Sequence, residues 1–127
     1  METNFIMCDT NIFINWFNND KQTIDKLEEI GLENIAVSVI TIMELIQGVD
    51  NKEQLQRLKK KIKNYTIIDF TDEVSKLSLK LIENYKLSHN LQIPDAIIGA
   101  TAISYKIPLF SYNTKDFIFM PKLVLYK

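Results

Sequence analysis

Cysteine and histidine are nearly missing from this chain, which contains one of each, Cys8 and His89. A single cysteine cannot form an internal disulfide, and its apolar surroundings favour core packing and a reducing compartment. His89 lies in a polar Ser-His-Asn segment, where we expect it to face solvent. Because histidine and cysteine clusters are missing, any metal site would have to consist of oxygen ligands.

An excess of positive charge is also missing, since 15 basic residues face 16 acidic ones and the net charge is −1. Any nucleic-acid role must therefore depend on a local basic patch, or on metal ions that reverse the charge of an acidic site. The chain shows no signal-peptide pattern at its start and no apolar run of about 18 residues. We therefore expect a cytoplasmic protein without a membrane association.

The hydrophobic and charged fractions, 46% and 24%, are those of an ordinary globular protein, and the length suits one domain over residues 1–127. Short apolar runs alternate with helical patterns along the chain. Strands are expected over residues 5–8, 35–39, 65–70, 109–112 and 123–126. Helices are expected over residues 10–17, 21–30, 40–47, 52–63, 71–90 and 94–105, with a short turn over 114–117. This alternation predicts an α/β fold with a central, mostly parallel sheet of four to five strands.

Acidic and polar residues follow two of the expected strands at their carboxyl ends, where open α/β sheets bind ligands. Asp9 follows the first strand, and Asn113 and Asp116 follow the fourth. Thr10 can cap the helix that begins beside Asp9. Each of these residues alone can also be explained as ordinary turn or cap chemistry.

Two further acids belong to expected helices. Asp95 is the only charged residue from Leu91 to Tyr105, in a helix that is apolar on nearly every face. A position in the first helical turn suits a carboxylate, but it does not account for the lack of a basic neighbour. Glu44 lies away from the apolar stripe of its helix and, by pattern alone, could face solvent. That stripe comprises Ile42, Leu45, Ile46 and Val49.

Together, these acids come from four separate segments that meet at one edge of the predicted sheet: Asp9, Glu44, Asp95 and Asp116. Carboxylates gathered in one cleft repel one another unless a cation lies among them. An oxygen-only set of ligands favours Mg²⁺ or Mn²⁺. Such ions typically bridge a phosphate and activate water for in-line attack.

Four short motifs in this order resemble those of PIN-domain ribonucleases, in particular the VapC-type toxins of toxin–antitoxin pairs. They are Asp-Thr-Asn at 9–11, the segment 38–45 with Gly48, the segment 95–102, and the segment 111–117. Each motif alone is weak, but the order and the spacing of all four are specific. The resemblance covers essentially the whole chain and implies a PIN-like three-layer α/β/α sandwich.

The resemblance also implies roles for the four acids, which would be the catalytic residues. Asp9 and Asp95 would bind the Mg²⁺ or Mn²⁺ ion, and Glu44 and Asp116 would bind it directly or through water. In some relatives the acid near the fourth strand lies at the position of Asn113, so Asp116 could act only through water or a second metal.

The resemblance further implies that Thr10 and Ser111 orient the acids. The implied chemistry is hydrolysis of RNA phosphodiester bonds by a metal-activated water. The implied partners are RNA, a cognate antitoxin whose C-terminal segment covers or enters the site, and a second copy of the chain in a homodimer.

Other functions remain open at this stage. The chain could be a PIN-like nuclease of RNA processing outside a toxin–antitoxin pair, or a non-catalytic α/β interaction module. Phosphoryl transfer through Asp9 generally requires a second acid two residues later, where this chain has Asn11. A response-regulator-like domain would also require paired acids at this point. The basic run over 57–63 is typical of a solvated helix face, although it could help to hold RNA.

Overall fold

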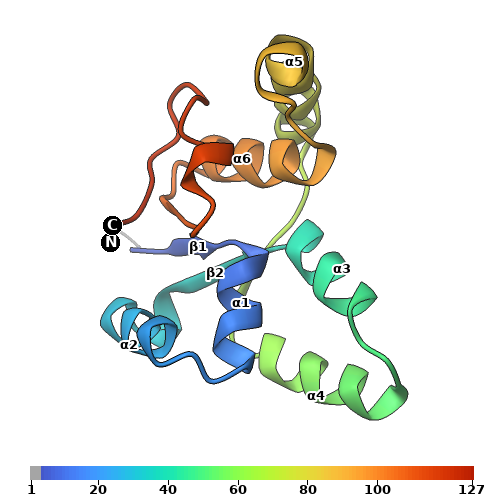
Figure 1. Cartoon of the computed structure of the whole chain (residues 1–127), viewed down its shortest axis with the longest axis vertical. Coiled ribbons are helices and arrows are strands. Elements are labelled where there is room, and N and C mark those ends of the chain that lie inside the picture. The colour runs from blue at the N-terminus through green and yellow to red at the C-terminus, as the bar shows by residue number, and fades with distance from the viewer. Residues whose placement is uncertain (1–3) are drawn as a thin grey trace.

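The computed structural model describes residues 4–127, and within them four parallel strands form a central sheet in the order β3-β2-β1-β4 (Figure 1). The strands are β1 (Ile6–Cys8), β2 (Ile35–Ser38), β3 (Thr66–Ile68) and β4 (Leu109–Phe110). In the central register, Met7 of β1 lies opposite Ala36 on one side and Leu109 on the other. The predicted parallel α/β sheet is therefore confirmed.

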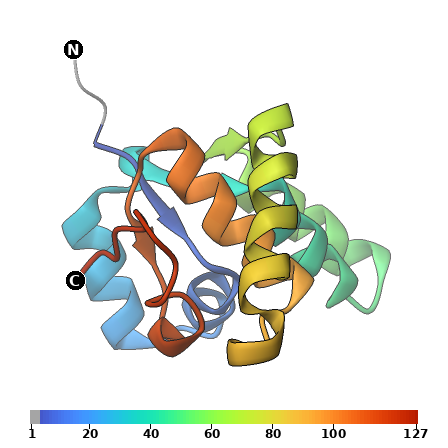
Figure 2. The same ribbon diagram turned by 90° about the horizontal axis from the view of Figure 1, so that it is seen from above.

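Helices cover both faces of this sheet. They are α1 (Thr10–Phe17), α2 (Lys21–Ile30), α3 (Val39–Gln47), α4 (Lys52–Ile62), α5 (Asp72–His89) and α6 (Ile93–Tyr105), with the short 3-10 helices η1 (Leu32–Asn34) and η2 (Thr114–Asp116). Helices α5 and α6 lie side by side on one face (Figure 2), and α1, α2 and α4 lie on the other (Figure 1). The result is the expected three-layer α/β/α sandwich. Among the described residues, every helix is too short or too polar to cross a membrane.

Side chains of the strands alternate between two apolar cores, one on each face of the sheet. Met7 and Ala36 contribute to the core beneath α5 and α6, whereas Cys8 and Val37 contribute to the core beneath α1, α2 and α4. This two-sided burial explains why the strands are continuously apolar in the sequence. Cys8 is fully buried, and burial raises the pKa of its thiol, so it packs in the core as predicted.

Because all strand pairings are parallel, the carboxyl ends of the strands meet at one edge of the sheet. At this edge Asp9 follows β1, α3 begins after Ser38, and Ser111 follows β4. Helix α6 contacts α3, and Asp95 in its first turn is close enough to Asp9 for the two charges to interact.

The expected strands at the end of the chain differ from the structure. The fourth strand stops at Phe110, because the Ser111 hydroxyl accepts the Asn113 N–H at 3.0 Å and closes a local turn. The expected strand over 123–126 forms only an isolated bridge between Leu109 and Leu125. A two-residue β4 offers too short an edge for a longer pairing.

Two local predictions are also corrected. The N-cap of α1 is Asp9 rather than Thr10, since the Asp9 carboxylate accepts the Thr10 N–H and Thr10 is the first helical residue. Only part of the predicted apolar stripe of α3 is buried. Leu45 is buried, whereas Ile46 is 39% exposed because α3 lies at the margin of the molecule (Figure 1).

Candidate active site

Asp9 is held rigidly at the carboxyl edge of the sheet. Its Oδ1 accepts the Thr10 N–H at 2.7 Å and its Oδ2 accepts the Ser111 hydroxyl at 2.7 Å, and the residue is only 4% exposed. Burial raises the pKa of Asp9, the bonds from Ser111 and Thr10 oppose this effect, and the charges of Glu44 and Asp116 add to the rise. The carboxylate is therefore fixed in position among other acids.

Glu44 joins this site from the second turn of α3. The Thr10 hydroxyl donates to Glu44 Oε1 at 2.7 Å, which ties the start of α1 to α3. The side chain of Glu44 is half-buried, although the sequence pattern was compatible with full exposure to solvent. The contact with Thr10 decides which way this acid points.

Two buried hydroxyls that sequence reasoning did not select support this contact. Thr41 Oγ1 lies 3.3 Å from both Thr10 Oγ1 and Ser38 Oγ, and the Ser38 side chain caps α3 by accepting the Thr41 N–H. Ser38 and Thr41 are fully buried. A serine at the end of a buried strand, just before a helix, is a recognisable N-cap and was the available signal.

Asp95 lies in the first turn of α6 and has no basic partner. Among residues 4–127, none of the four acids forms an ion pair. The pKa of Asp95 is raised to about 6, chiefly by burial and then by the charges of Asp9, Asp116 and Glu44. The neighbours of this carboxylate are other carboxylates, so the site attracts cations.

Asp116 lies in η2, and Asn113 lies immediately before it. The charge of Asp116 adds to the rise in pKa of both Asp9 and Asp95, which burial chiefly causes. Asn113 immediately precedes η2 and its backbone N–H donates to the Ser111 hydroxyl, but its side chain does not cap the helix. Both residues are half-buried.

All seven residues selected from the sequence therefore lie at or beside one edge of the sheet. The four acids are close enough for their charges to interact, yet no three acidic, histidine or cysteine side chains of residues 4–127 converge as a ready-made metal cage. Mutual repulsion favours such spacing between carboxylates. The donor set consists of carboxylate, hydroxyl and amide oxygens, which is the chemistry that hard divalent cations require.

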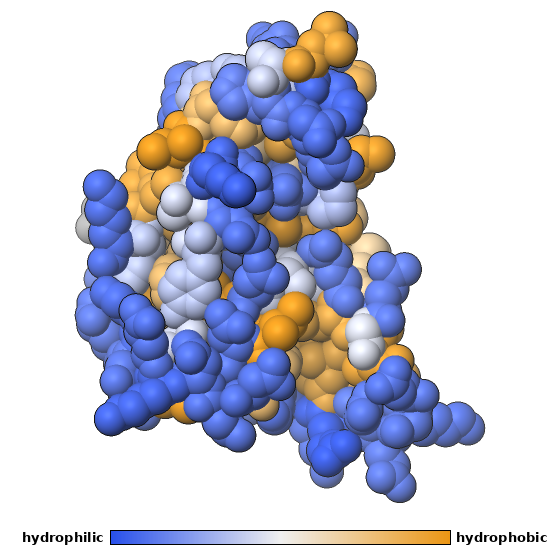
Figure 3. Space-filling view, viewed as in Figure 1, coloured by the Kyte–Doolittle hydropathy of each residue, from blue (hydrophilic) through white to orange (hydrophobic). Residues whose placement is uncertain are grey.

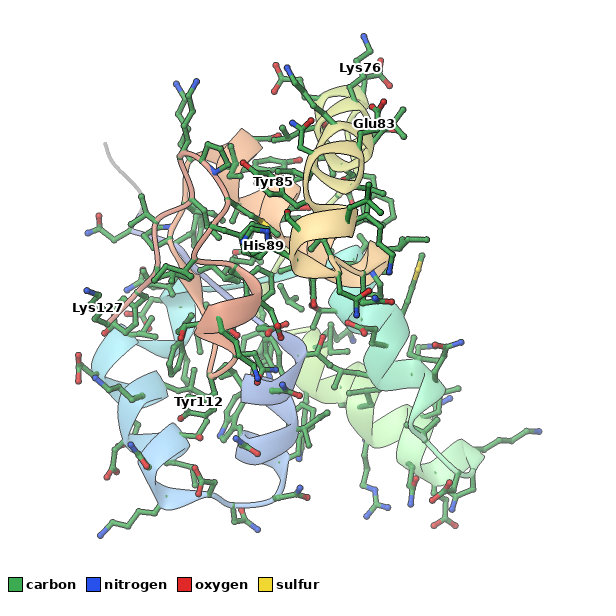
Figure 4. All side chains as sticks on the ribbon, turned by 45° about the horizontal axis from the view of Figure 1, so that its top comes forward. Lys76, Glu83, Tyr85, His89, Tyr112 and Lys127 are labelled. Atoms are coloured by element: carbon green, nitrogen blue, oxygen red, sulfur yellow. The ribbon has the colours of Figure 1, made fainter. Side chains whose placement is uncertain are left out.

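Tyr112 and His89 make their contacts with residues other than the four acids. Tyr112 points from the end of β4 toward α2 (Figure 4), and its hydroxyl lies 2.7 Å from Thr23 Oγ1. His89 is exposed at the end of α5, where its ring stacks on Phe119 with 4.1 Å between centroids and meets the edge of Tyr85 (Figure 4). The only histidine therefore belongs to an aromatic cluster rather than to the acidic site.

The burial of Asp95, together with the acids around it, predicts how the stability of the metal-free protein depends on pH. The pKa of this carboxyl is about 6 in the folded state against 3.8 ordinarily, so between these values the folded state binds the proton more tightly than the unfolded chain. The contribution of Asp95 to the free energy of unfolding should therefore fall as the pH rises through this range. Urea unfolding in EDTA at several pH values measures this change in the free energy of unfolding. An Asp95→Asn variant should lack this part of the decline, and an identical profile for both proteins would contradict the prediction.

Comparisons with known proteins place this geometry in a family. Residues 6–122 match the model of the PIN domain. Ribonuclease VapC of Rickettsia bellii is 33% identical over 95 residues, which cover 68% of this chain and 71% of that protein. Ribonuclease VapC1 of Methanocaldococcus jannaschii is 31% identical over 118 residues, which cover 91% of this chain and 81% of the relative.

Solved structures agree with this assignment. A toxin–antitoxin complex from Klebsiella pneumoniae contains a chain that is 34% identical and superposes with a TM-score of 0.80, covering 96% of this chain and 98% of that one. PIN-domain ribonucleases generally depend on a divalent metal, which suits the carboxylate-rich edge described above. The family model spans nearly the whole chain and two relatives exceed 30% identity, so the chain belongs to the PIN-domain family.

Proposed function

We propose that this protein is a metal-dependent endoribonuclease that acts as the toxin of a toxin–antitoxin pair. The observation that carries the proposal is the acidic site itself, in which the charges of three other acids act on Asp95 and, among residues 4–127, no ion pair neutralises any of the four. Two relatives are named ribonucleases, and a similar solved chain belongs to a toxin–antitoxin complex. We propose that residues 1–127 act as one PIN-like domain and that the protein works in the cytoplasm.

The proposed cofactor is Mg²⁺ or Mn²⁺, because the available donors are oxygens. Asp9 and Asp95 would be the direct ligands, and Glu44 and Asp116 would bind directly or through water. A bound ion would neutralise phosphate charge and make a coordinated water more acidic than bulk water. Asn113 is the alternative to Asp116 as the contact from this part of the chain.

The protein's own residues would prepare this site before RNA arrives. Ser111 and Thr10 hold both oxygens of Asp9, so its carboxylate loses little freedom on binding a cation. Thr10 also holds Glu44 through its hydroxyl, which couples the two acids through one residue. Such fixed oxygens reduce the reorganisation that a charged transition state would otherwise require.

The proposal is tested by RNA cleavage with the purified chain. A single-stranded RNA should be cut in Mg²⁺ or Mn²⁺, cleavage should stop in excess EDTA, and added metal should restore it. Analysis of the product ends separates internal cuts from trimming at the termini. If cleavage continues undiminished in EDTA, a metal-dependent mechanism is wrong, and if metal-loaded protein cuts no RNA, the proposed activity is wrong.

We propose two protein partners. One is a cognate antitoxin, supported by the toxin–antitoxin complex that the chain resembles. Induced expression of this chain should arrest bacterial growth, and co-expression of the proposed antitoxin should relieve the arrest. An arrest of equal strength caused by an Asp95→Asn variant would exclude RNA cleavage as its cause.

The second partner is another copy of the same chain. Large apolar side chains are exposed on α5 and at the start of α6, where Leu79 is 64%, Leu87 99% and Ile93 67% exposed. Exposed apolar side chains of this size commonly mark interaction surfaces. Sedimentation velocity should show a dimer that Leu87→Asp weakens, and a monomeric wild-type protein would contradict the homodimer.

A further inference from the structure

Tyr112 joins the end of β4 to helix α2 through a chain of hydrogen bonds. Its hydroxyl lies 2.7 Å from Thr23 Oγ1. The Thr23 hydroxyl donates to Asp20 Oδ2 at 2.6 Å, and the same carboxylate oxygen caps α2 by accepting the Thr23 N–H. A hydroxyl has only one proton to donate, so Thr23 accepts the proton of Tyr112. The bonds therefore run in one direction, from Tyr112 through Thr23 to the carboxylate of Asp20.

The Thr23 hydroxyl lies on the buried side of α2. The outer surface of this helix is largely hydrophilic (Figure 3), whereas its buried residues are Thr23, Leu27 and Ile30. Thr23 is 0% exposed. A hydroxyl in such surroundings is costly unless it has hydrogen-bond partners. Because Thr23 is removed from solvent, its bond with Tyr112 is also stronger than a bond at the surface would be.

Two neighbouring residues fix the segment between β4 and η2, which we call the β4–η2 segment (residues 111–116). The Ser111 hydroxyl donates to Asp9 Oδ2 at the end of β1, and the side chain of Tyr112 points toward α2 (Figure 4). Within the described part of the chain, these two bonds are the side-chain hydrogen bonds from this segment to other elements. The segment also carries Asp116, so the place of this acid depends on both bonds.

We propose that Tyr112 is a positioning residue of the acidic site. Its bond to Thr23 holds the β4–η2 segment against α2 and thereby sets where Asp116 lies relative to Asp9. This role rests on the proposed ribonuclease function, since it concerns the acids that would bind the metal. A hydrogen bond between uncharged groups favours the closed arrangement roughly two- to tenfold. Without this bond the segment opens more often, and a cation at the acids is bound less tightly.

The test uses Tyr112→Phe, which removes the hydroxyl and keeps the ring together with its edge contact to Phe110, at 5.4 Å between centroids. The matched control is Tyr126→Phe. The Tyr126 hydroxyl also bonds to α2, where it donates to Glu29 Oε1 at 2.8 Å, and its ring also meets Phe110. Tyr126 lies outside the β4–η2 segment, so its hydroxyl cannot position Asp116 in the proposed way.

Two measurements do not depend on RNA cleavage. Amide hydrogen exchange of the β4–η2 segment in EDTA reports how often the segment opens, and calorimetric titration with Mn²⁺ reports the affinity of the acids for a cation. Tyr112→Phe should speed the exchange and weaken Mn²⁺ binding, each roughly two- to tenfold, whereas Tyr126→Phe should change neither. The proposed role is wrong if Tyr112→Phe behaves like the wild type, or if both variants have the same effect.

Kinetics of RNA cleavage add a readout that a loss of overall stability would not change. At a temperature where every variant is folded, Tyr112→Phe should lower kcat and leave KM unchanged, because the residue acts through the acids rather than on RNA. Thr23→Val should have the same effect, and Thr23→Ser should restore the wild-type rate. A fall in KM-dependent binding alone, with kcat unchanged, would contradict the proposed role.

The double variant decides whether the two residues act through their shared bond. Tyr112→Phe combined with Thr23→Val should be no slower than either single variant, because both remove the same interaction. Effects that multiply would overturn the inference, since the two hydroxyls would then act separately. If the wild-type chain cuts no RNA, the ribonuclease function fails, and hydrogen exchange and Mn²⁺ affinity still decide the role of Tyr112.

Discussion

Replacing Asp95 with asparagine should lower the rate of RNA cleavage about a thousandfold or more. The substitution keeps the shape of the side chain but removes the charge that would bind the cation, and such charge stabilisation contributes several kcal/mol. The fold should survive, because the charge of Asp95 is opposed by burial and by three acids in the metal-free protein. Initial rates in saturating Mg²⁺, compared with the wild-type chain, measure the effect.

Two further variants make this result specific. Asp50→Asn is the matched control, since Asp50 is an exposed acid between α3 and α4 and should leave the rate unchanged. Asp9→Asn should be as damaging as Asp95→Asn, although asparagine remains a good N-cap for α1. An Asp95→Asn protein that unfolds like the wild type and keeps more than about a tenth of its activity would refute the carboxylate-metal mechanism.

Replacing Phe13 with alanine should lower the free energy of unfolding by about 3–5 kcal/mol, the usual cost of removing a buried aromatic ring. Phe13 is fully buried in α1, and its ring lies 6.5 Å from Trp16, 6.3 Å from Phe17 and 5.8 Å from Tyr65 between centroids. Removing the ring leaves a cavity among three aromatic neighbours that cannot all move to fill it. Urea unfolding with linear extrapolation gives the change directly.

The control for Phe13→Ala is the same substitution at an aromatic residue that is exposed to solvent. Phe70 is 44% exposed just before α5, and Phe70→Ala should cost less than about 1 kcal/mol. Because α1 begins at Thr10 and carries the residue that holds both Asp9 and Glu44, Phe13→Ala should also weaken cleavage at temperatures where the protein stays folded. A loss of stability no greater than that of Phe70→Ala would show that the α1 core is loosely packed.

The elements that the sequence predicted well depend on local chemistry. Buried strands such as β1 and β2 read as short apolar runs, and α5 begins where Thr71 caps it and ends at an Asn90 in the left-handed conformation. These signals act within a few residues, so a single sequence contains them. The family motifs were also visible, and the comparisons confirm the family that they indicated.

The features that the sequence predicted poorly depend on contacts with other elements of the fold. The segment over 123–126 has the composition of a strand, but a strand requires a partner, and β4 provides only two residues. The helical pattern of α3 likewise could not show that Ile46 would be 39% exposed. In both cases the outcome depends on which neighbour is present and how far it extends.

For the site, the sequence by itself determined the chemistry: oxygen donors, acids at the ends of strands, and an Asp95 without a basic neighbour. Tertiary structure alone decided the geometry, because parallel pairing brings four distant segments to one edge. It turned Glu44 inward through the Thr10 hydroxyl and made Asp9 both cap and site residue. It also brought the hydroxyl of Tyr112 to Thr23, a contact between residues 89 positions apart that no local pattern of the sequence contains.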